Sequence, residues 1–235
     1  MALILNIETT TEVCSVALSN NGVLIELMES DEEKAHASKL TPLIQLILKK
    51  HNIKPQQLDA LAVSKGPGSY TGLRIGVSVI KGLCYSLNKP LIAVSTLQTL
   101  SWKVTQTYQK NNLLSDKLML FCPMMDARRM EVYTAFFDIN NKVVRKVSAD
   151  IIDETSYRDI LDKQQIVFFG NGAEKCKPFI IHSNAKFIDG IANSSQYMIA
   201  LSEEAFKNKI FEDIAYFDPF YLKEFMTTTP KNKLF

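Results

Sequence analysis

The hydrophobic positions of this chain form short apolar runs first and helical stripes afterwards. Three runs, at residues 3–7, 13–18 and 23–28, are rich in apolar and β-branched side chains, and the last two flank a Ser-Asn-Asn-Gly turn sequence at 19–22. Apolar runs around an Asn-Gly turn are typical of antiparallel strands. The chain is therefore predicted to open with a strand meander.

A helix and a strand-helix-strand unit follow this meander. Over residues 37–50 the apolar side chains recur at helical spacing and leave the lysines and Gln45 outside one stripe. The next elements are a buried strand, a helix and a strand, at 58–64, 71–87 and 91–95. This order predicts one layer of an α/β fold.

The second half alternates less regularly, and no internal repeat is visible in it. Its predicted elements are a helix at 97–109, strands at 118–124, 131–138, 142–147 and 166–170, and a helix at 195–209. We expect an α/β fold with two lobes, each a mixed sheet flanked by helices. The first lobe is predicted at residues 1–110 and the second at 111–235, with the final helix able to return to the first lobe.

Composition places the chain among ordinary globular proteins. Its 235 residues are 46% hydrophobic and 22% charged, which excludes disordered, collagen-like and disulfide-scaffold classes. The 27 basic and 25 acidic side chains give a net charge of +2, less basic than is usual for a chain that binds nucleic acid by itself. The four scattered cysteines are expected to be buried free thiols. With no secretion signal and no apolar run of about 20 residues, we expect a cytoplasmic protein without membrane contact.

The end of the first strand is one candidate for binding a nucleotide. Thr9, Thr10 and Thr11 offer hydroxyl and backbone N–H groups, and Gly170 and Gly172 at the end of a later strand are a second candidate contact. The alternative interpretation is a turn whose threonine hydroxyls satisfy local backbone groups.

A glycine-rich loop at residues 65–76 runs from a strand into a helix. It lacks the spacing of a Walker loop, because Leu73 and Arg74 stand where a lysine and a hydroxyl residue are needed. Glycine recurs at positions 72, 76 and 82, and each costs up to about 1 kcal/mol in a helix interior relative to alanine. We expect another backbone to approach this helix closely, from the same lobe or from a second chain.

Two adjacent arginines, Arg128 and Arg129, follow Asp126 between two predicted strands. Guanidinium groups bind phosphate or carboxylate in a bidentate manner, so the pair is a candidate contact for an anion. The alternative is that Asp126 pairs with one of them on a solvated turn. No histidine cluster at metal-ligand spacing and no G-x-S-x-G elbow is present, so we expect neither a metal site nor a catalytic residue.

These motifs together resemble one known family. The segments that carry the resemblance are 4–10, 13–18, 65–76 and 126–133, with further matches in the expected order at 36–44, 94–97, 170–173 and 219–223. They closely resemble the TsaB family, also called YeaZ, over nearly the whole chain. The stretch from Gly66 to Gly76 is the most specific part, whereas Glu8 departs from the Asp that many relatives carry.

The resemblance implies a fold and a set of partners. The fold is the two-lobed actin-like fold of the ribonuclease H-like class, shared with sugar kinases and Hsp70 ATPases. The implied role is that of a non-catalytic subunit that stabilises the metalloenzyme TsaD in making threonylcarbamoyladenosine at adenosine 37 of ANN-decoding tRNAs, with the ATPase TsaE. ATP and a metal ion are then used by these partners, and this chain binds no cofactor itself.

The metal-binding histidines of TsaD have no counterpart here. Its Val-Asn-His-x-x-x-His segment corresponds to residues 94–100, where Thr96 and Leu100 replace the two imidazoles. A Thr and a Leu cannot hold the metal. The leading competing interpretation is a self-sufficient ATP-dependent kinase or ATPase. A metallopeptidase is the second and less favoured alternative.

The two helices of the first lobe are the predicted docking face for TsaD. The candidate interface positions are Leu40, Leu43, Ile44, Ile47, Arg74, Val77, Ser78 and Lys81. Val77→Glu is expected to abolish pairing and leave the chain folded. In the absence of the partner the same helices are expected to form a homodimer.

Overall fold

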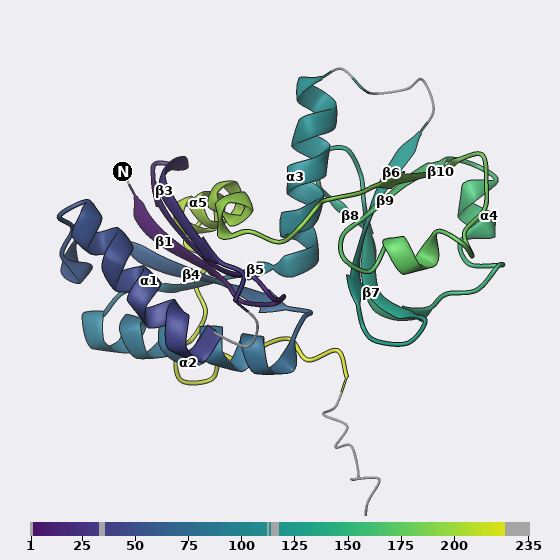
Figure 1. Ribbon diagram of the computed structural model, residues 1–235. Helices are drawn as coiled ribbons and strands as arrows, with labels where there is room; N and C mark the ends of the chain where they lie inside the picture. Colours follow the sequence, from purple (N-terminus) through teal and green to yellow (C-terminus); the bar gives the residue numbers. More distant parts are fainter. Residues whose placement is uncertain (1, 33–35, 112, 114–117, 224–235) are drawn as a thin grey trace, which may run out of the picture.

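The computed structural model describes residues 2–32, 36–111, 113 and 118–223. Figure 1 shows two lobes side by side, with the helix α3 standing between them. Within those ranges no helix has both the length and the apolar character that a membrane crossing requires.

The first lobe is built on a five-stranded mixed sheet. Its strands are β1 (Leu3–Glu8), β2 (Cys14–Asn20), β3 (Val23–Ser30), β4 (Ala60–Gly66) and β5 (Leu91–Ser95), in the order β3-β2-β1-β4-β5. Helices α1 (His36–Lys50) and α2 (Tyr70–Leu87) cover one face, and a short 3-10 turn, η1 (Pro55–Gln57), precedes β4. Because the apolar stripes of both helices face this sheet, Leu40, Ile47 and Ile80 are fully buried.

The second lobe contains a sheet of the same size. Its strands are β6 (Met119–Asp126), β7 (Glu131–Phe137), β8 (Val143–Ile151), β9 (Gln165–Phe169) and β10 (Ala185–Ile188), in the order β10-β9-β6-β7-β8. Helix α3 (Thr96–Lys110) covers one face, while α4 (Arg158–Leu161) and η2 (Glu174–Cys176) lie over the other. The short strand β10 was not expected from the sequence.

The two sheets share one topology. In each, the first three strands form an antiparallel meander, and the fourth and fifth strands are added parallel to the first. The fold is therefore a structural duplication although the sequence shows no repeat. The predicted fold class, an α/β chain with two mixed sheets flanked by helices, is confirmed.

Two helices pack against a sheet other than the one whose strand directly precedes them in the chain. Helix α3 follows β5 directly, yet Leu97, Leu100 and Val104 pack against the second sheet. Helix α5 (Ile199–Lys207), after the 3-10 turn η3 (Ser195–Met198), returns to cover the second face of the first sheet. The predicted division at residue 110 assigns α3 to the first lobe by sequence order, whereas its apolar face joins the second core; the division itself stays a prediction.

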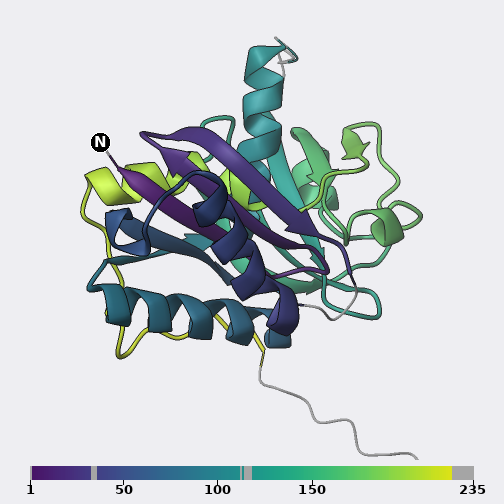
Figure 2. The same cartoon turned by 60° about the vertical axis from the view of Figure 1, so that its left-hand side comes forward.

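A C-terminal strap, defined as residues 211–223, connects the two lobes. It runs along β5 and beneath α2, where Phe217 enters the first core and its carbonyl oxygen accepts a hydrogen bond from Lys81 Nζ (2.8 Å). Phe220 N then donates to the Lys65 carbonyl oxygen (2.7 Å). The strap ends on the second lobe, where Lys223 forms an ion pair with Glu131. Figures 1 and 2 both show this segment passing under α2.

Candidate functional site

The small residues on the inner side of α2 are explained by contacts inside the chain. A Cβ at Gly72 would lie 2.0 Å from Thr9 O, and one at Gly76 would lie 2.4 Å from Thr9 Oγ1. Gly68, just before the helix, is as tightly placed against Thr10. The turn after β1 therefore provides the close backbone approach, and the intrachain alternative accounts for these three glycines.

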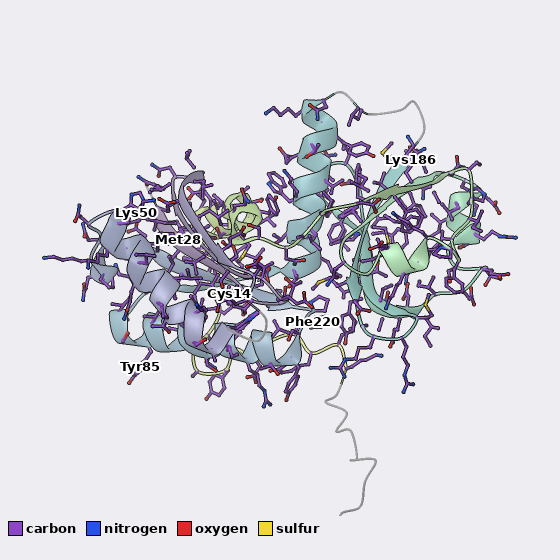
Figure 3. All side chains as sticks on the ribbon, in the orientation of Figure 1. Cys14, Met28, Lys50, Tyr85, Lys186 and Phe220 are labelled. Carbon is purple, nitrogen blue, oxygen red and sulfur yellow. The ribbon has the colours of Figure 1, made fainter. Side chains whose placement is uncertain are left out.

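Gly82 on the same helix differs from them. No atom lies within 4 Å of a Cβ built at this position, and the residue is exposed. It continues an outward stripe with Arg74, Ser78 and Ser86, all exposed, and next to it stands Tyr85 with 82% of its surface open. Figure 3 shows Tyr85 pointing away from the molecule. Among the described residues, this outward stripe is the exposed side of α2.

The predicted interface must be corrected in the light of this packing. Four of its positions belong to the core of the first lobe, with exposed fractions between 0% and 4%: Leu40, Ile44, Ile47 and Val77. Leu43 and Lys81 are half-buried, and Arg74 and Ser78 are exposed. The apolar stripe of an amphipathic helix faces its own sheet, so Val77→Glu would place a charge in the core and is no test of pairing.

Neighbouring α1 adds one exposed apolar residue that the predicted set lacked. Leu46 is 54% exposed, and α1 lies beside α2 in both ribbon views. The sequence could have pointed to Leu46 because it lies outside the stripe that Leu40, Ile44 and Ile47 define. Tyr85, three positions after Gly82, also lies on the outward side of α2.

The turn after β1 uses its polar groups internally. Thr9 Oγ1 donates to the Gly72 carbonyl oxygen (2.8 Å), and Thr10 donates to Glu8 Oε1 from its backbone nitrogen (2.6 Å) and its hydroxyl (2.5 Å). The other Glu8 oxygen accepts from Ser64 on β4. Thr9 and Thr10 are at most 2% exposed, and the Thr11 carbonyl oxygen contacts His36 Nε2 (2.7 Å). The geometry favours the structural interpretation of this turn; its binding of nucleotide stays a prediction.

Glu8 is a fully buried carboxyl group at the end of a sheet strand. Burial raises its pKa above the ordinary value of 4.5, although the hydrogen bonds from Ser64 and Thr10 oppose this shift. Asn193 Nδ2, in the segment that returns from the second lobe, donates to the Thr10 hydroxyl (3.4 Å). Glu8 therefore joins β1, β4 and the returning segment, rather than facing an open cleft.

Gly170 and Gly172 lie beside the turn between β6 and β7. Gly170 has φ +103°, and a Cβ there would meet Met124 O at 2.5 Å. Gly172 N donates to the same carbonyl oxygen (2.9 Å), while Asn171 Oδ1 accepts from Asp126 N (3.1 Å). The structure thus brings the predicted glycines together with the predicted arginine turn.

Asp126 does not form the ion pair with Arg128 or Arg129 that the sequence left open. Asp126 accepts the backbone N–H of Arg128 (3.0 Å) and forms its ion pair with Lys175, which lies 49 positions away in the chain. Arg128 and Arg129 are both exposed, and in the described part of the chain neither guanidinium group has an ion pair or a hydrogen bond. As far as the described residues go, both guanidinium groups are open to an anion from outside.

The positions aligned with the paired histidines are filled by packing. Thr96 begins α3 and Leu100 lies one turn later, and both have no exposed surface. Leu100 packs into the core between α3 and the second sheet. This end of α3 supports the two lobes.

Comparisons with known proteins show which family the chain is similar to. The family model described as TsaD, tRNA N6-adenosine threonylcarbamoyltransferase, matches residues 23–229. The chain is 32% identical over 162 residues to the tRNA threonylcarbamoyladenosine biosynthesis protein TsaB of Haemophilus influenzae, a match covering 68% of this chain and 62% of that protein. The TsaB of Bacillus subtilis is 35% identical over 147 residues, covering 63% and 60%. The chain thus spans less than two thirds of the length of these two relatives.

A solved structure supports the fold separately. YeaZ from Pseudomonas aeruginosa superposes with a TM-score of 0.78 at 22% identity, covering 94% of this chain and 100% of that one. At this identity the likeness concerns the fold, and it confirms the predicted fold. With the family match over residues 23–229, the chain belongs to the TsaD-related family and, within it, to the TsaB (YeaZ) family.

Proposed function

We propose that this protein is the accessory subunit that pairs with a TsaD-type paralogue in the synthesis of threonylcarbamoyladenosine on tRNA. The outward stripe of α2 is the observation that carries the proposal. Arg74, Ser78, Gly82 and Ser86 form a row of exposed, mostly small residues, and Gly82 has open space where a side chain would be. A second helix can approach such a row closely.

The rest of the proposed interface surrounds this row. Leu46 on α1 and Tyr85 on α2 add exposed apolar area of the kind that interfaces bury. Arg74 lies over the Tyr70 ring (4.3 Å from its centroid), and its Nε donates to Tyr221 Oη (3.4 Å). This cluster fixes the arginine at the end of the stripe, where it provides a positioned charge for the partner.

The chemistry in this proposal belongs to the partners. The paralogue holds the metal and transfers the threonylcarbamoyl group, TsaE hydrolyses ATP, and this chain holds no cofactor of its own. The buried hydrogen bonds of Thr9 and Thr10, and the packed side chains of Thr96 and Leu100, support a non-catalytic role over that of an independent ATPase or metallopeptidase. We place the complex in the cytoplasm, and the chain alone forms a homodimer through the same stripe.

Ser78→Glu is the direct test of this docking face. A charge in the middle of a desolvated interface costs enough to lower the affinity for the paralogue by roughly a hundredfold or more, as measured by calorimetry or sedimentation. Ser183→Glu, the same change at an exposed serine of the second lobe, is the matched control. Equal affinity of the two variants would refute the docking face.

Reconstituted tRNA modification tests the role itself. Modification is expected to require both this chain and the paralogue, and to be lost with Ser78→Glu but not with Ser183→Glu. Modification by this chain alone, or undiminished modification without it, would overturn the proposed function.

A further inference from the structure

The turn between β6 and β7 holds two successive arginines in an unusual backbone conformation. Arg128 has φ +70° and Arg129 has φ +49°, both in the left-handed region. For residues with a Cβ this region costs roughly 1–2 kcal/mol each, and it persists only where surrounding contacts impose it. A position of this kind is normally filled by glycine, asparagine or aspartate.

Contacts from another element impose this conformation. Lys175 Nζ donates to the carbonyl oxygens of Arg129 and Glu131 (both 2.7 Å) and pairs with Asp126. Within the turn, Ala127 N donates to Glu131 O (3.1 Å) and Glu131 N to Arg128 O (3.2 Å). The turn is therefore held from below by a lysine, with its two arginine side chains on the exposed side.

The charges around the turn leave a local positive excess. Asp126 is paired with Lys175, and Glu131 is paired with Lys223 from the C-terminal strap. The two acidic groups of the turn are thus neutralised by lysines from distant parts of the chain, and within the described residues no carboxylate pairs with Arg128 or Arg129.

The strap adds no positive charge, since it carries three carboxylates and one lysine, but it links the turn to an aromatic cluster on α2. Two positions before Lys223, Tyr221 packs against Tyr70 with ring centroids 4.8 Å apart, and Arg74 lies over the Tyr70 ring. In Figure 1 the strap runs from below α2 to the bottom of the second lobe. Arginine side chains and aromatic rings on one surface are the usual composition of sites that follow an RNA backbone.

We propose that the arginine turn binds phosphate groups of RNA, with the aromatic cluster at the end of the strap beside it. The N–H groups of Ala127, Arg128 and Glu131 already donate within the turn, which favours its guanidinium groups over its backbone as the anion contact. Its free donors are guanidinium groups on an exposed surface, which suits an extended polyanion. If the proposed function holds, this RNA is the tRNA that the complex modifies.

Glycine substitution tests the inference because it separates the side chains from the backbone. Arg128→Gly combined with Arg129→Gly removes both guanidinium groups and allows the same φ angles. We expect this double variant to bind unmodified tRNA roughly tenfold more weakly at about 0.15 M salt, and to lower the slope of log affinity against log salt by about 2. Its melting temperature should not fall.

The control and the conservative variant sharpen this test. Lys142→Ala combined with Lys186→Ala removes two exposed cations from other parts of the second lobe and should leave tRNA affinity unchanged. Arg128→Lys with Arg129→Lys keeps the charge and should recover most of the binding. Fluorescence anisotropy with labelled tRNA is measured for the full chain alone and for its mixture with the paralogue.

The outcomes separate this inference from the proposed function. Unchanged tRNA affinity in the glycine double variant, or a loss of ATP binding in place of tRNA binding, would overturn the RNA site. Failure of the unsubstituted chain to pair with the paralogue in sedimentation would instead count against the proposed function, and the anisotropy of the chain alone would still decide the RNA site.

Discussion

Gly72 and Gly82 occupy opposite environments on one helix, so the same substitution should have opposite effects at the two positions. A Cβ at Gly72 would lie 2.0 Å from Thr9 O, far inside the 3.4 Å at which ordinary contact begins, whereas a Cβ at Gly82 meets nothing within 4 Å. Alanine in a helix is favoured over glycine by up to about 1 kcal/mol. Gly82→Ala should therefore stabilise the fold by about that amount.

Gly72→Ala should destabilise it. The obstructing atom is backbone, and the Thr9 hydroxyl is hydrogen-bonded to Gly72 O, so the turn cannot move away without losing that bond. Overpacking of this kind costs roughly 1–3 kcal/mol and a lost buried hydrogen bond about 1 kcal/mol more. After subtraction of the helix-propensity gain of about 1 kcal/mol, Gly72→Ala should lower the free energy of unfolding by about 2 kcal/mol. Because Gly82→Ala should raise it by about 1 kcal/mol, the two variants should differ by about 3 kcal/mol.

Urea denaturation followed by circular dichroism measures this difference. For a chain of this size, about 3 kcal/mol corresponds to a separation of roughly 6–12 °C in melting temperature. Equal stability of the two variants would refute the close contact between the turn after β1 and α2. Because Gly82 lies in the proposed docking face, its alanine variant should also weaken pairing with the paralogue while raising the stability of the chain alone.

Two further substitutions test the buried Glu8 and the strap. The raised pKa of Glu8 means that the folded chain holds the Glu8 proton more tightly than the unfolded chain, so the stabilisation by protonated Glu8 is present below about pH 4.5 and is lost as the pH rises. Glu8→Gln should remove this pH-dependent loss of stability. Urea midpoints that fall equally from about pH 5 to pH 8 in the variant and the unsubstituted chain would contradict this prediction. Phe217→Ala should lower the free energy of unfolding by about 3 kcal/mol because Phe217 is 8% exposed in the first core. The control variant Phe211→Ala, at a position 40% exposed, should lower it far less. Similar melting curves for the two variants would show that Phe217 does not anchor the strap to the first core.

The helices and most strands of the fold could be predicted because their patterns are local. The helical stripe of Leu40, Ile44 and Ile47 fixed the position and the apolar side of α1. The same pattern could not say whether that side faces the lobe's own sheet or a partner, and the structure decides for the sheet. Strand β10 was missed because its four residues, Ala185–Ile188, carry too short a pattern.

The candidate sites depended on contacts between distant residues, which a sequence pattern does not contain. The partner of Gly72 is Thr9, 63 positions earlier, and the partner of Asp126 is Lys175, 49 positions later. The glycine spacing indicated a close approach correctly at Gly72 and Gly76, although not its source, whereas nothing in the described chain approaches Gly82. For the arginine pair, the sequence left Asp126 as a possible partner, and only the fold shows that this carboxylate is already paired.

The return of α5 and the strap to the first lobe has a consequence for synthesis of the chain. All five strands of the first sheet are made by residue 95, whereas the helix that covers its second face begins at residue 199. At about 5–20 residues per second, a ribosome needs roughly 5–20 s to add the segment between them. During that interval the side chains of Ile4, Ile92 and Val94 lack the cover that α5 provides, so the nascent chain exposes an apolar sheet face until α5 emerges.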